Sequence, residues 1–288
     1  MIKRLTLAGI LLCAAIVLAS LVVGWALARP VQARVGSPPD ALHAEAVTFP
    51  SESGTIVHAW WCPVSDSKAA ALLLPGVRAN RLSMVDRAIF LRRSGYSVLL
   101  IDFQATGETP GHKITFGWRE SRDVLAAVTF IRARQPLSRI AIVGSSLGGA
   151  AALLATPPLR VQALVLEAVY PTIERATDNR LRIYLGSIGP LGTPLLLSQL
   201  SMRLGVSSKQ LRPVDHIAAV DCPVLIINGL QDVRTTREDA MLLYSHSRPP
   251  KQLWLVPGVG HGDIHRARRA EYETRLLSFL SSITRRSP

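Results

Sequence analysis

Short runs of apolar residues alternate with longer segments of helical periodicity between residues 46 and 166. The first two runs flank a turn that contains serine and glycine, so we expect a pair of antiparallel strands at the start of the domain. The later runs alternate with helical segments, which predicts a parallel sheet with helices between its strands. Strands are expected at 46–49, 56–61, 70–74, 97–103, 140–143 and 163–166, and helices at 82–94, 119–134 and 147–156.

The alternation stops after Tyr170 and apolar segments of helical character, broken by glycines and prolines, continue to Asp215. We therefore expect an insertion at about 171–215 inside one domain that covers 45–284. About 250 residues suit a single domain with a large core. The apolar side chains of the insertion either line a pocket for an acyl or aryl group or pack the insertion on the domain. They are Ile183, Tyr184, Leu185, Leu195, Leu196 and Leu197.

The N-terminus carries a long apolar run. Residues 5–28 contain no charged side chain and follow the basic pair Lys3 and Arg4. A helix of this length extends about 36 Å, which is enough to cross a hydrocarbon core of about 30 Å. Cleaved signal peptides have shorter apolar regions. The pattern favours a transmembrane signal-anchor at 5–28, preceded by a cytoplasmic n-region at 1–4.

A linker at 29–44, which contains prolines and a glycine, is expected to join the anchor to the domain. The domain is then periplasmic or otherwise extracytoplasmic, because positive charges favour the cytoplasmic side. Ala26-Leu27-Ala28 also resembles a cleavage site, and cleavage there would make the protein secreted.

The formal net charge is +13, but the basic residues are scattered along the chain rather than grouped with aromatic residues. This distribution argues against nucleic-acid binding and is compatible with anionic lipid head groups. Cys62 and Cys222 are expected to be free thiols, because their strands should not be neighbours. The spacing of cysteine and histidine indicates no metal site, and no cofactor is expected.

A G-x-S-x-G pattern follows the apolar run at 140–143 and leads into a series of small residues. This strand–turn–helix context is typical of a nucleophile elbow, in which a sharp turn exposes one serine. Ser146 lies between Gly144 and Gly148, whose missing side chains leave room for a strained turn and close helix packing. An ordinary strand-to-helix turn is the alternative. Ser146 is therefore the candidate nucleophile.

An acid and a histidine follow the serine in the order that such enzymes require. Asp232 comes after the apolar run C-P-V-L-I-I-N-G, and His261 comes after Q-L-W-L-V-P-G-V-G. Each lies just beyond an expected strand, where α/β sheets build their sites. The alternatives are a turn aspartate and a surface histidine. His246 and His265 also lie downstream, but the first ends a helical pattern and the second lies in the basic start of the last helix.

A serine nucleophile also needs two backbone N–H groups that stabilise the developing oxyanion. Leu147, the residue after the nucleophile, is one candidate donor. Val77 is the other, because Gly76 allows the loop after the strand at 70–74 to turn there. Arg78 and Arg81 in the same loop are expected either to recognise an anionic substrate group or to have salt-bridge and surface roles.

These motifs together resemble the α/β-hydrolase superfamily, and most of all bacterial esterase-like serine hydrolases, over residues 47–280. The resemblance is carried by L-L-L-P-G-V-R-A-N-R, Y-S-V-L-L-I-D-F, G-E-T-P-G, G-S-S-L-G-G, N-G-L-Q-D and G-V-G-H-G-D. It implies a mostly parallel eight-stranded sheet with helices on both faces and a small helical cap at the insertion. Pro75-Gly76 stands where many relatives have His-Gly, and a serine nucleophile argues against epoxide and halide cleavage.

The resemblance implies a Ser-Asp-His triad of Ser146, Asp232 and His261. The expected function is a membrane-anchored serine hydrolase that cleaves carboxylic esters of small molecules or lipids through an acyl-enzyme. A thioesterase, lipase or serine peptidase would use the same triad. A catalytically silent, membrane-tethered binding protein is the alternative outside enzymes.

Overall fold

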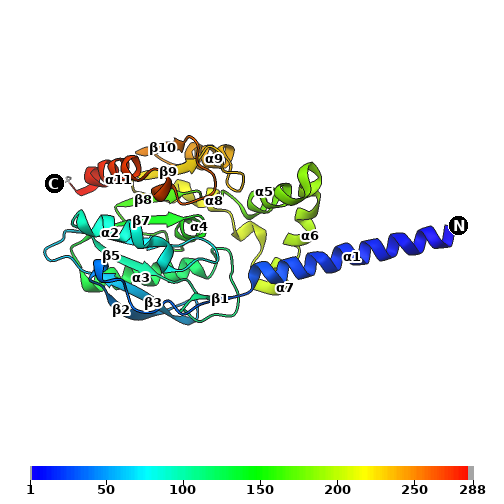
Figure 1. Cartoon of the computed structure of the whole chain (residues 1–288), viewed down its shortest axis with the longest axis horizontal. Helices are drawn as coiled ribbons and strands as arrows, with labels where there is room; N and C mark the ends of the chain where they lie inside the picture. Colours follow the sequence, from blue (N-terminus) through cyan, green and yellow to red (C-terminus); the bar gives the residue numbers. More distant parts are fainter. Residues whose placement is uncertain (1, 285–288) are drawn as a thin grey trace.

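The computed structural model describes residues 2–284, and its buried strands pair into one eight-stranded sheet in the order β10-β9-β8-β7-β4-β5-β3-β2 (Figure 1). The β2–β3 and β3–β5 pairs of this sheet are antiparallel, and its other described pairs are parallel. The strands are β2 (Glu45–Ser51), β3 (Thr55–Cys62), β4 (Ala69–Leu74), β5 (Ser97–Ile101), β7 (Arg139–Ser145), β8 (Ala163–Glu167), β9 (Val224–Gly229) and β10 (Lys251–Val256). The predicted, mostly parallel eight-stranded sheet is thus confirmed.

Helices cover both faces of this sheet, as the resemblance implied. The central strands β4, β5, β8 and β9 are buried at every position, as expected when both faces are covered. Successive residues such as Leu72 and Leu73 therefore belong to separate cores on opposite faces. One face packs against α3 (Glu120–Arg134), α4 (Leu147–Leu153), α8 (Pro213–His216) and α9 (Arg237–His246), and the other against α2 (Val85–Arg93), α10 (Ile264–Ala267) and α11 (Arg269–Thr284).

The segment expected to be a linker is attached to the domain. Its β1 (Val31–Gln32) pairs with β6 (Thr106–Gly107), and its 3-10 turn η1 (Asp40–Leu42) buries Leu42 completely. The Val31 amide also donates to the carbonyl of Ala105 at 2.8 Å. The direction in which the N-terminal helix leaves the domain is therefore fixed by hydrogen bonds.

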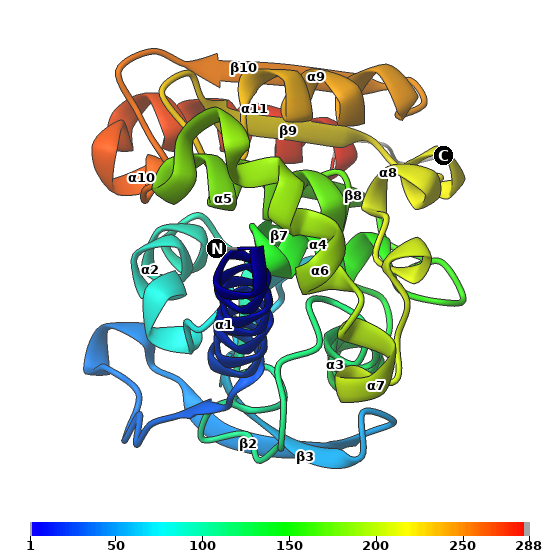
Figure 2. The same cartoon turned by 90° about the vertical axis from the view of Figure 1, so that its right-hand side faces the viewer.

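The chain between β8 and β9 forms the small helical cap. Its elements are α5 (Ile173–Leu185), η3 (Gly186–Gly192), α6 (Thr193–Leu197), α7 (Leu200–Leu204) and η4 (Ser208–Gln210), followed by α8 and η5 (Ile217–Ala219). The helices are short because Gly186, at φ +61°, ends α5, and Pro190 interrupts the following turn. Figure 2, which looks along the N-terminal helix, shows α5, α6 and α7 at the end of the domain from which that helix projects.

The N-terminal helix α1 (Ile2–Ala28) extends away from the domain, and most of its described side chains are exposed (Figure 1). Its residues Thr6–Ala28 are long and apolar enough to cross a membrane by length and composition. The last turns contact the cap. The Gln199 amide donates to the Ser20 hydroxyl at 2.8 Å, and Arg203 donates to the carbonyl of Leu21 at 3.0 Å.

Candidate active site

Ser146 lies on a sharp turn between β7 and α4. Its backbone has φ +47° and ψ −109°, a region that residues other than glycine rarely adopt. The Ser146 amide donates to the carbonyl of Glu167, at the end of β8, at 2.7 Å. A Cβ atom on Gly148 would lie 2.5 Å from the carbonyl oxygen of Leu74, and one on Gly144 would lie 2.5 Å from a backbone nitrogen. The two glycines therefore permit the close packing that holds the turn in its strained conformation.

Asp232 and His261 lie on the loops after β9 and β10. The Asp232 Oδ2 atom is 2.7 Å from His261 Nδ1. The other carboxylate oxygen accepts the amides of Arg234 and Thr235, at 2.8 Å and 3.0 Å. The Thr235 hydroxyl donates to Oδ2 at 2.6 Å. Burial disfavours ionisation of Asp232, but the hydrogen bonds from His261 and Thr235 outweigh it and hold the pKa of the carboxyl below its ordinary value.

A cavity of about 600 Å³ brings the candidate residues together. Ser146 and His261 both line it, and so do Val77 and Leu147. Asp232 is buried behind His261. In the described structure no hydrogen bond joins the Ser146 hydroxyl to His261, and such bonds are often loose until substrate binds. The arrangement places a serine hydroxyl, an imidazole and a hydrogen-bonded carboxylate close to one surface.

Most of the cavity wall is apolar and comes from the cap and from α1. Four of the six cap residues singled out in the sequence line it, namely Tyr184, Leu185, Leu196 and Leu197, whereas Ile183 and Leu195 do not. The end of α1 contributes Val23, Gly24, Leu27 and Ala28. Sequence reasoning did not anticipate this wall. The one signal was the pair Ser20 and Gly24, a hydroxyl and a glycine one turn apart in a leucine-rich run.

The two arginines near the expected oxyanion loop have different surroundings. Arg81 is buried, forms ion pairs with Asp102 and Glu108, and lies over the ring of Trp60 at 4.7 Å. Of the two roles expected for Arg81, substrate recognition or a salt bridge, the structure therefore shows the salt bridge. Arg78 lines the cavity and donates to the carbonyl of Ala26 in α1 at 3.1 Å.

Thr235 is a site residue that sequence reasoning missed. It follows Asp232 by three residues, the spacing at which an aspartate accepts hydrogen bonds from its own turn. Its hydroxyl is buried between the carboxylate and the imidazole, 3.4 Å from His261 Nδ1. Thr235 therefore fixes the orientation of the pair.

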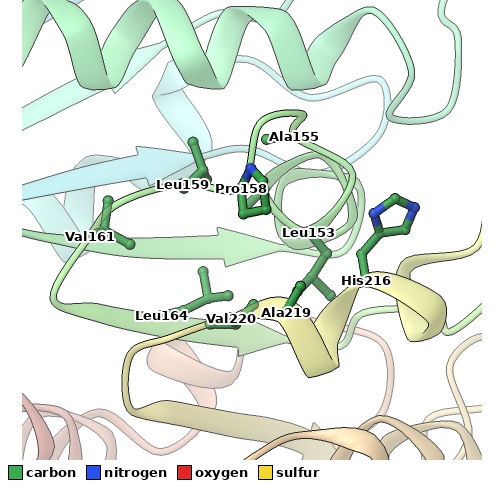
Figure 3. A pocket seen from close by; sticks show the side chains of 10 residues that line it. Leu153, Ala155, Pro158, Leu159, Val161, Leu164, His216, Ala219 and Val220 are labelled. Atoms are coloured by element: carbon green, nitrogen blue, oxygen red, sulfur yellow. The ribbon is translucent and has the colours of Figure 1, made fainter.

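A second cavity, shown in Figure 3, lies beside the end of α4. It has a volume of about 30 Å³ and a wall of mostly apolar side chains, with His216 at one side. This volume holds no more than a water molecule or two. It shares no lining residue with the large cavity, which is therefore the candidate active site.

Known proteins resemble the chain in both sequence and structure. An uncharacterised protein of Mycobacterium tuberculosis is 28% identical over 222 residues, which cover 75% of this chain and 72% of the relative. The alpha/beta hydrolase domain-containing protein WAV2 of Arabidopsis thaliana is 28% identical over 210 residues, 70% of this chain and 66% of the relative.

Among solved structures, the esterase Pf2001 of Pyrococcus furiosus superposes with a TM-score of 0.72 at 20% identity, covering 88% of this chain and 99% of the esterase. At that identity the likeness supports the fold alone. The model of the alpha/beta hydrolase family matches residues 57–274, from β3 into α11. With its sheet, elbow and cap in place, the chain belongs to the alpha/beta hydrolase family.

Proposed function

We propose that the protein is a membrane-anchored serine hydrolase that cleaves carboxylic esters. One observation carries the proposal. Ser146, on a strained elbow, shares a cavity with His261, whose Nδ1 atom is hydrogen-bonded to the buried Asp232. A serine activated by such a pair attacks acyl carbonyl groups.

In the proposed reaction, His261 Nε2 takes the proton of the Ser146 hydroxyl while Oγ bonds to the ester carbonyl carbon. Asp232 keeps the Nδ1–H tautomer and stabilises the imidazolium that forms. The backbone amides of Leu147 and Val77 are the proposed donors to the oxyanion. His261 then protonates the departing alcohol. Water, deprotonated by the same imidazole, releases the acid and restores Ser146.

The apolar wall supports an acyl ester as the bond that is cleaved. Leucine side chains of the cap and the apolar end of α1 surround the space next to Ser146. Such a surface stabilises a hydrocarbon chain by removing it from water. The length and composition of α1 support membrane anchoring, with the basic residues before it on the cytoplasmic side and the domain on the opposite side.

The neighbouring serines provide the test. Ser146→Ala should lower the rate of p-nitrophenyl butyrate hydrolysis at least about a thousandfold and abolish labelling by a fluorophosphonate. Ser145→Ala, at the end of β7, is the matched control and should keep labelling and turnover within a few-fold of the parent. Thermal unfolding of both variants checks that they are folded. Equal turnover by Ser146→Ala and the parent would overturn the assignment.

A further inference from the structure

The large cavity has an unbalanced charge. Four arginines line it, and none of the aspartates and glutamates that the structure describes does. Arg78 and Arg203 are occupied with carbonyl groups of α1, those of Ala26 and Leu21. Arg180 and Arg234 also line the cavity, and neither forms an ion pair with an acidic side chain among the described residues. Burial and the charge of Arg234 lower the pKa of Arg180, although Asp232 and a hydrogen bond with Tyr184 partly oppose this. Two guanidinium groups that form no ion pair with an acidic side chain, at one cavity, favour an anionic ligand group there.

The wall formed by α1 is partly open to the outside. Val23 and Leu27 line the cavity, yet 42% and 41% of their surfaces are exposed. A Cβ atom on Gly24 would lie 2.6 Å from Gln199 Oε1, so α1 touches the cap closely at this point. The side of the cavity formed by α1 is therefore apolar and partly accessible.

The length of α1 determines how deep the cap lies. Residues Thr6–Ala28 are long enough for a hydrocarbon core of about 30 Å. From Ser20 onward the helix contacts the cap, and the part before Ser20 spans only about 21 Å. The helix can cross the core only if several of its residues beside the cap also lie at membrane depth. With α1 in the membrane as proposed above, the cap and the cavity opening lie at the bilayer surface.

The cap surface is consistent with that position. Ile188, Leu191 and Met202 are exposed by 65%, 82% and 78%, and none of them lines the cavity. Ile188 and Leu191 belong to η3 and Met202 to α7, and the cap helices α5, α6 and α7 lie at the end of the domain from which α1 projects (Figures 1 and 2). Large apolar side chains exposed next to an apolar helix favour contact with lipid.

Building on the proposed ester hydrolysis, we propose that the substrate is an anionic ester lipid that leaves the bilayer between α1 and the cap. Its acyl chain lies against Val23, Leu27 and the cap leucines, and its anionic group lies at Arg180 and Arg234. Ser146 Oγ bonds to the acyl carbon as the ester C–O bond breaks, and the proton of Ser146 reaches the departing lipid alkoxide through His261. Water, deprotonated by His261, then bonds to the acyl carbon, and the bond from that carbon to Ser146 Oγ breaks; Oγ regains a proton from His261 and the fatty acid is released.

The test uses the full chain in phosphatidylcholine vesicles with and without phosphatidylglycerol, with release of fatty acid from each lipid as the readout. The parent should prefer the anionic lipid. Arg180→Gln combined with Arg234→Gln should lower the ratio of anionic to zwitterionic hydrolysis about tenfold or more. Arg237→Gln, on an exposed position of α9, is the matched control and should leave the ratio unchanged.

Two further comparisons test the route. Gly24→Leu displaces the Gln199 side chain and adds a bulky group to the cavity wall, so it should reduce lipid hydrolysis, whereas Gly9→Leu, where a Cβ atom meets nothing within 4 Å, should not. Leu191→Glu with Met202→Glu should reduce lipid hydrolysis in vesicles and leave hydrolysis of p-nitrophenyl butyrate in detergent unchanged.

Labelling of Ser146 and cleavage of the soluble ester separate the two proposals. If both are absent, the proposed ester hydrolysis fails. If both are present but vesicle lipids are not cleaved, or are cleaved without regard to charge, the lipid proposal alone is overturned. Preference for a soluble anionic ester over the same ester in vesicles would also overturn it, because the source would then not be the bilayer.

Discussion

At the scale of single residues, Thr235 adds to His261 in lowering the pKa of the Asp232 carboxyl. Thr235→Val removes the hydroxyl that donates to Asp232 Oδ2, so the pKa of the carboxyl should rise. We expect kcat/KM for ester hydrolysis to fall about tenfold and the acidic limb of its pH profile to move to higher pH. A pH series of initial rates measures both effects.

Thr235→Ser is the matched control, because it keeps the hydroxyl and loses only a methyl group. It should restore most of the rate and the position of the acidic limb. A Thr235→Val enzyme with lower activity but an unmoved pH profile would mean that the threonine acts through packing alone.

Gly148 is a second residue whose role can be measured. In Gly148→Ala, the new methyl group meets the backbone carbonyl of Leu74 at 2.5 Å, so α4 must move away from β4. We expect a loss of about 1–3 kcal/mol in the free energy of unfolding, together with a loss of activity, because the elbow moves with α4. Urea denaturation measures the first effect. Gly262→Ala, where the added atom meets nothing within 4 Å, should leave stability unchanged.

At the scale of elements, a buried charge network joins α2, β8 and the loop that carries His261. Arg87 in α2 forms ion pairs with Glu167 at 2.7 Å and with Asp263 at 2.8 Å, and Tyr272 in α11 donates to Glu167. Both side chains of the Arg87–Glu167 pair are almost fully buried. The network therefore connects the strand end behind Ser146 to a residue two positions after His261.

Arg87→Met should lower the free energy of unfolding by about 3–5 kcal/mol, because Glu167 is left charged inside the protein with the Tyr272 hydroxyl but no cation beside it. Denaturant titration of the purified chain measures the loss. Adding Glu167→Gln should recover part of the lost free energy of unfolding, since the buried charge of the Glu167 carboxylate is then removed. Arg212→Met breaks an exposed pair with Asp215 and should cost less than about 1 kcal/mol. Equal losses for Arg87→Met and Arg212→Met would contradict this account.

The strands were predictable because the local sequence alone indicates that they are buried. Runs such as Ala69–Leu74 are apolar at every position, which is the pattern of a strand covered on both faces. Element ends were less predictable. The helix expected at 147–156 ends at Leu153, before the prolines at 157 and 158, and the one expected at 82–94 begins as a 3-10 turn, Arg81–Met84.

At the scale of the whole molecule, the sequence did not allow us to predict contacts between segments that are far apart along the chain. Chain order and strand ends were enough to nominate Ser146, Asp232 and His261. The contact of α1 with the cavity was not predictable. Hydropathy indicates that a helix is apolar, but it does not indicate which face of the helix contacts the cap. The same holds for Arg180 and Arg234, which are far apart in sequence and ordinary in composition.

Global stability should depend on pH through Asp123, a fully buried carboxyl on α3. It accepts hydrogen bonds from the Ser51 hydroxyl and the Gln104 amide and lies near Glu120. Burial raises its pKa from 3.8 to about 6, and its hydrogen bonds only partly oppose this. The folded protein therefore binds this proton more tightly than the unfolded chain does. The resulting stabilisation is complete below pH 3.8 and is lost as the pH rises through about 6.

Asp123→Asn isolates this contribution, because an amide can accept from the Gln104 N–H, donate to the Ser51 hydroxyl and carry no charge. Relative to the parent, the variant should gain about 3 kcal/mol in the free energy of unfolding as the pH is raised from below 4 to 7. Urea denaturation of both full chains in detergent across this range measures the difference. Parallel stability curves would mean that Asp123 titrates alike in the folded and unfolded states, so that its hydrogen bonds fully offset its burial.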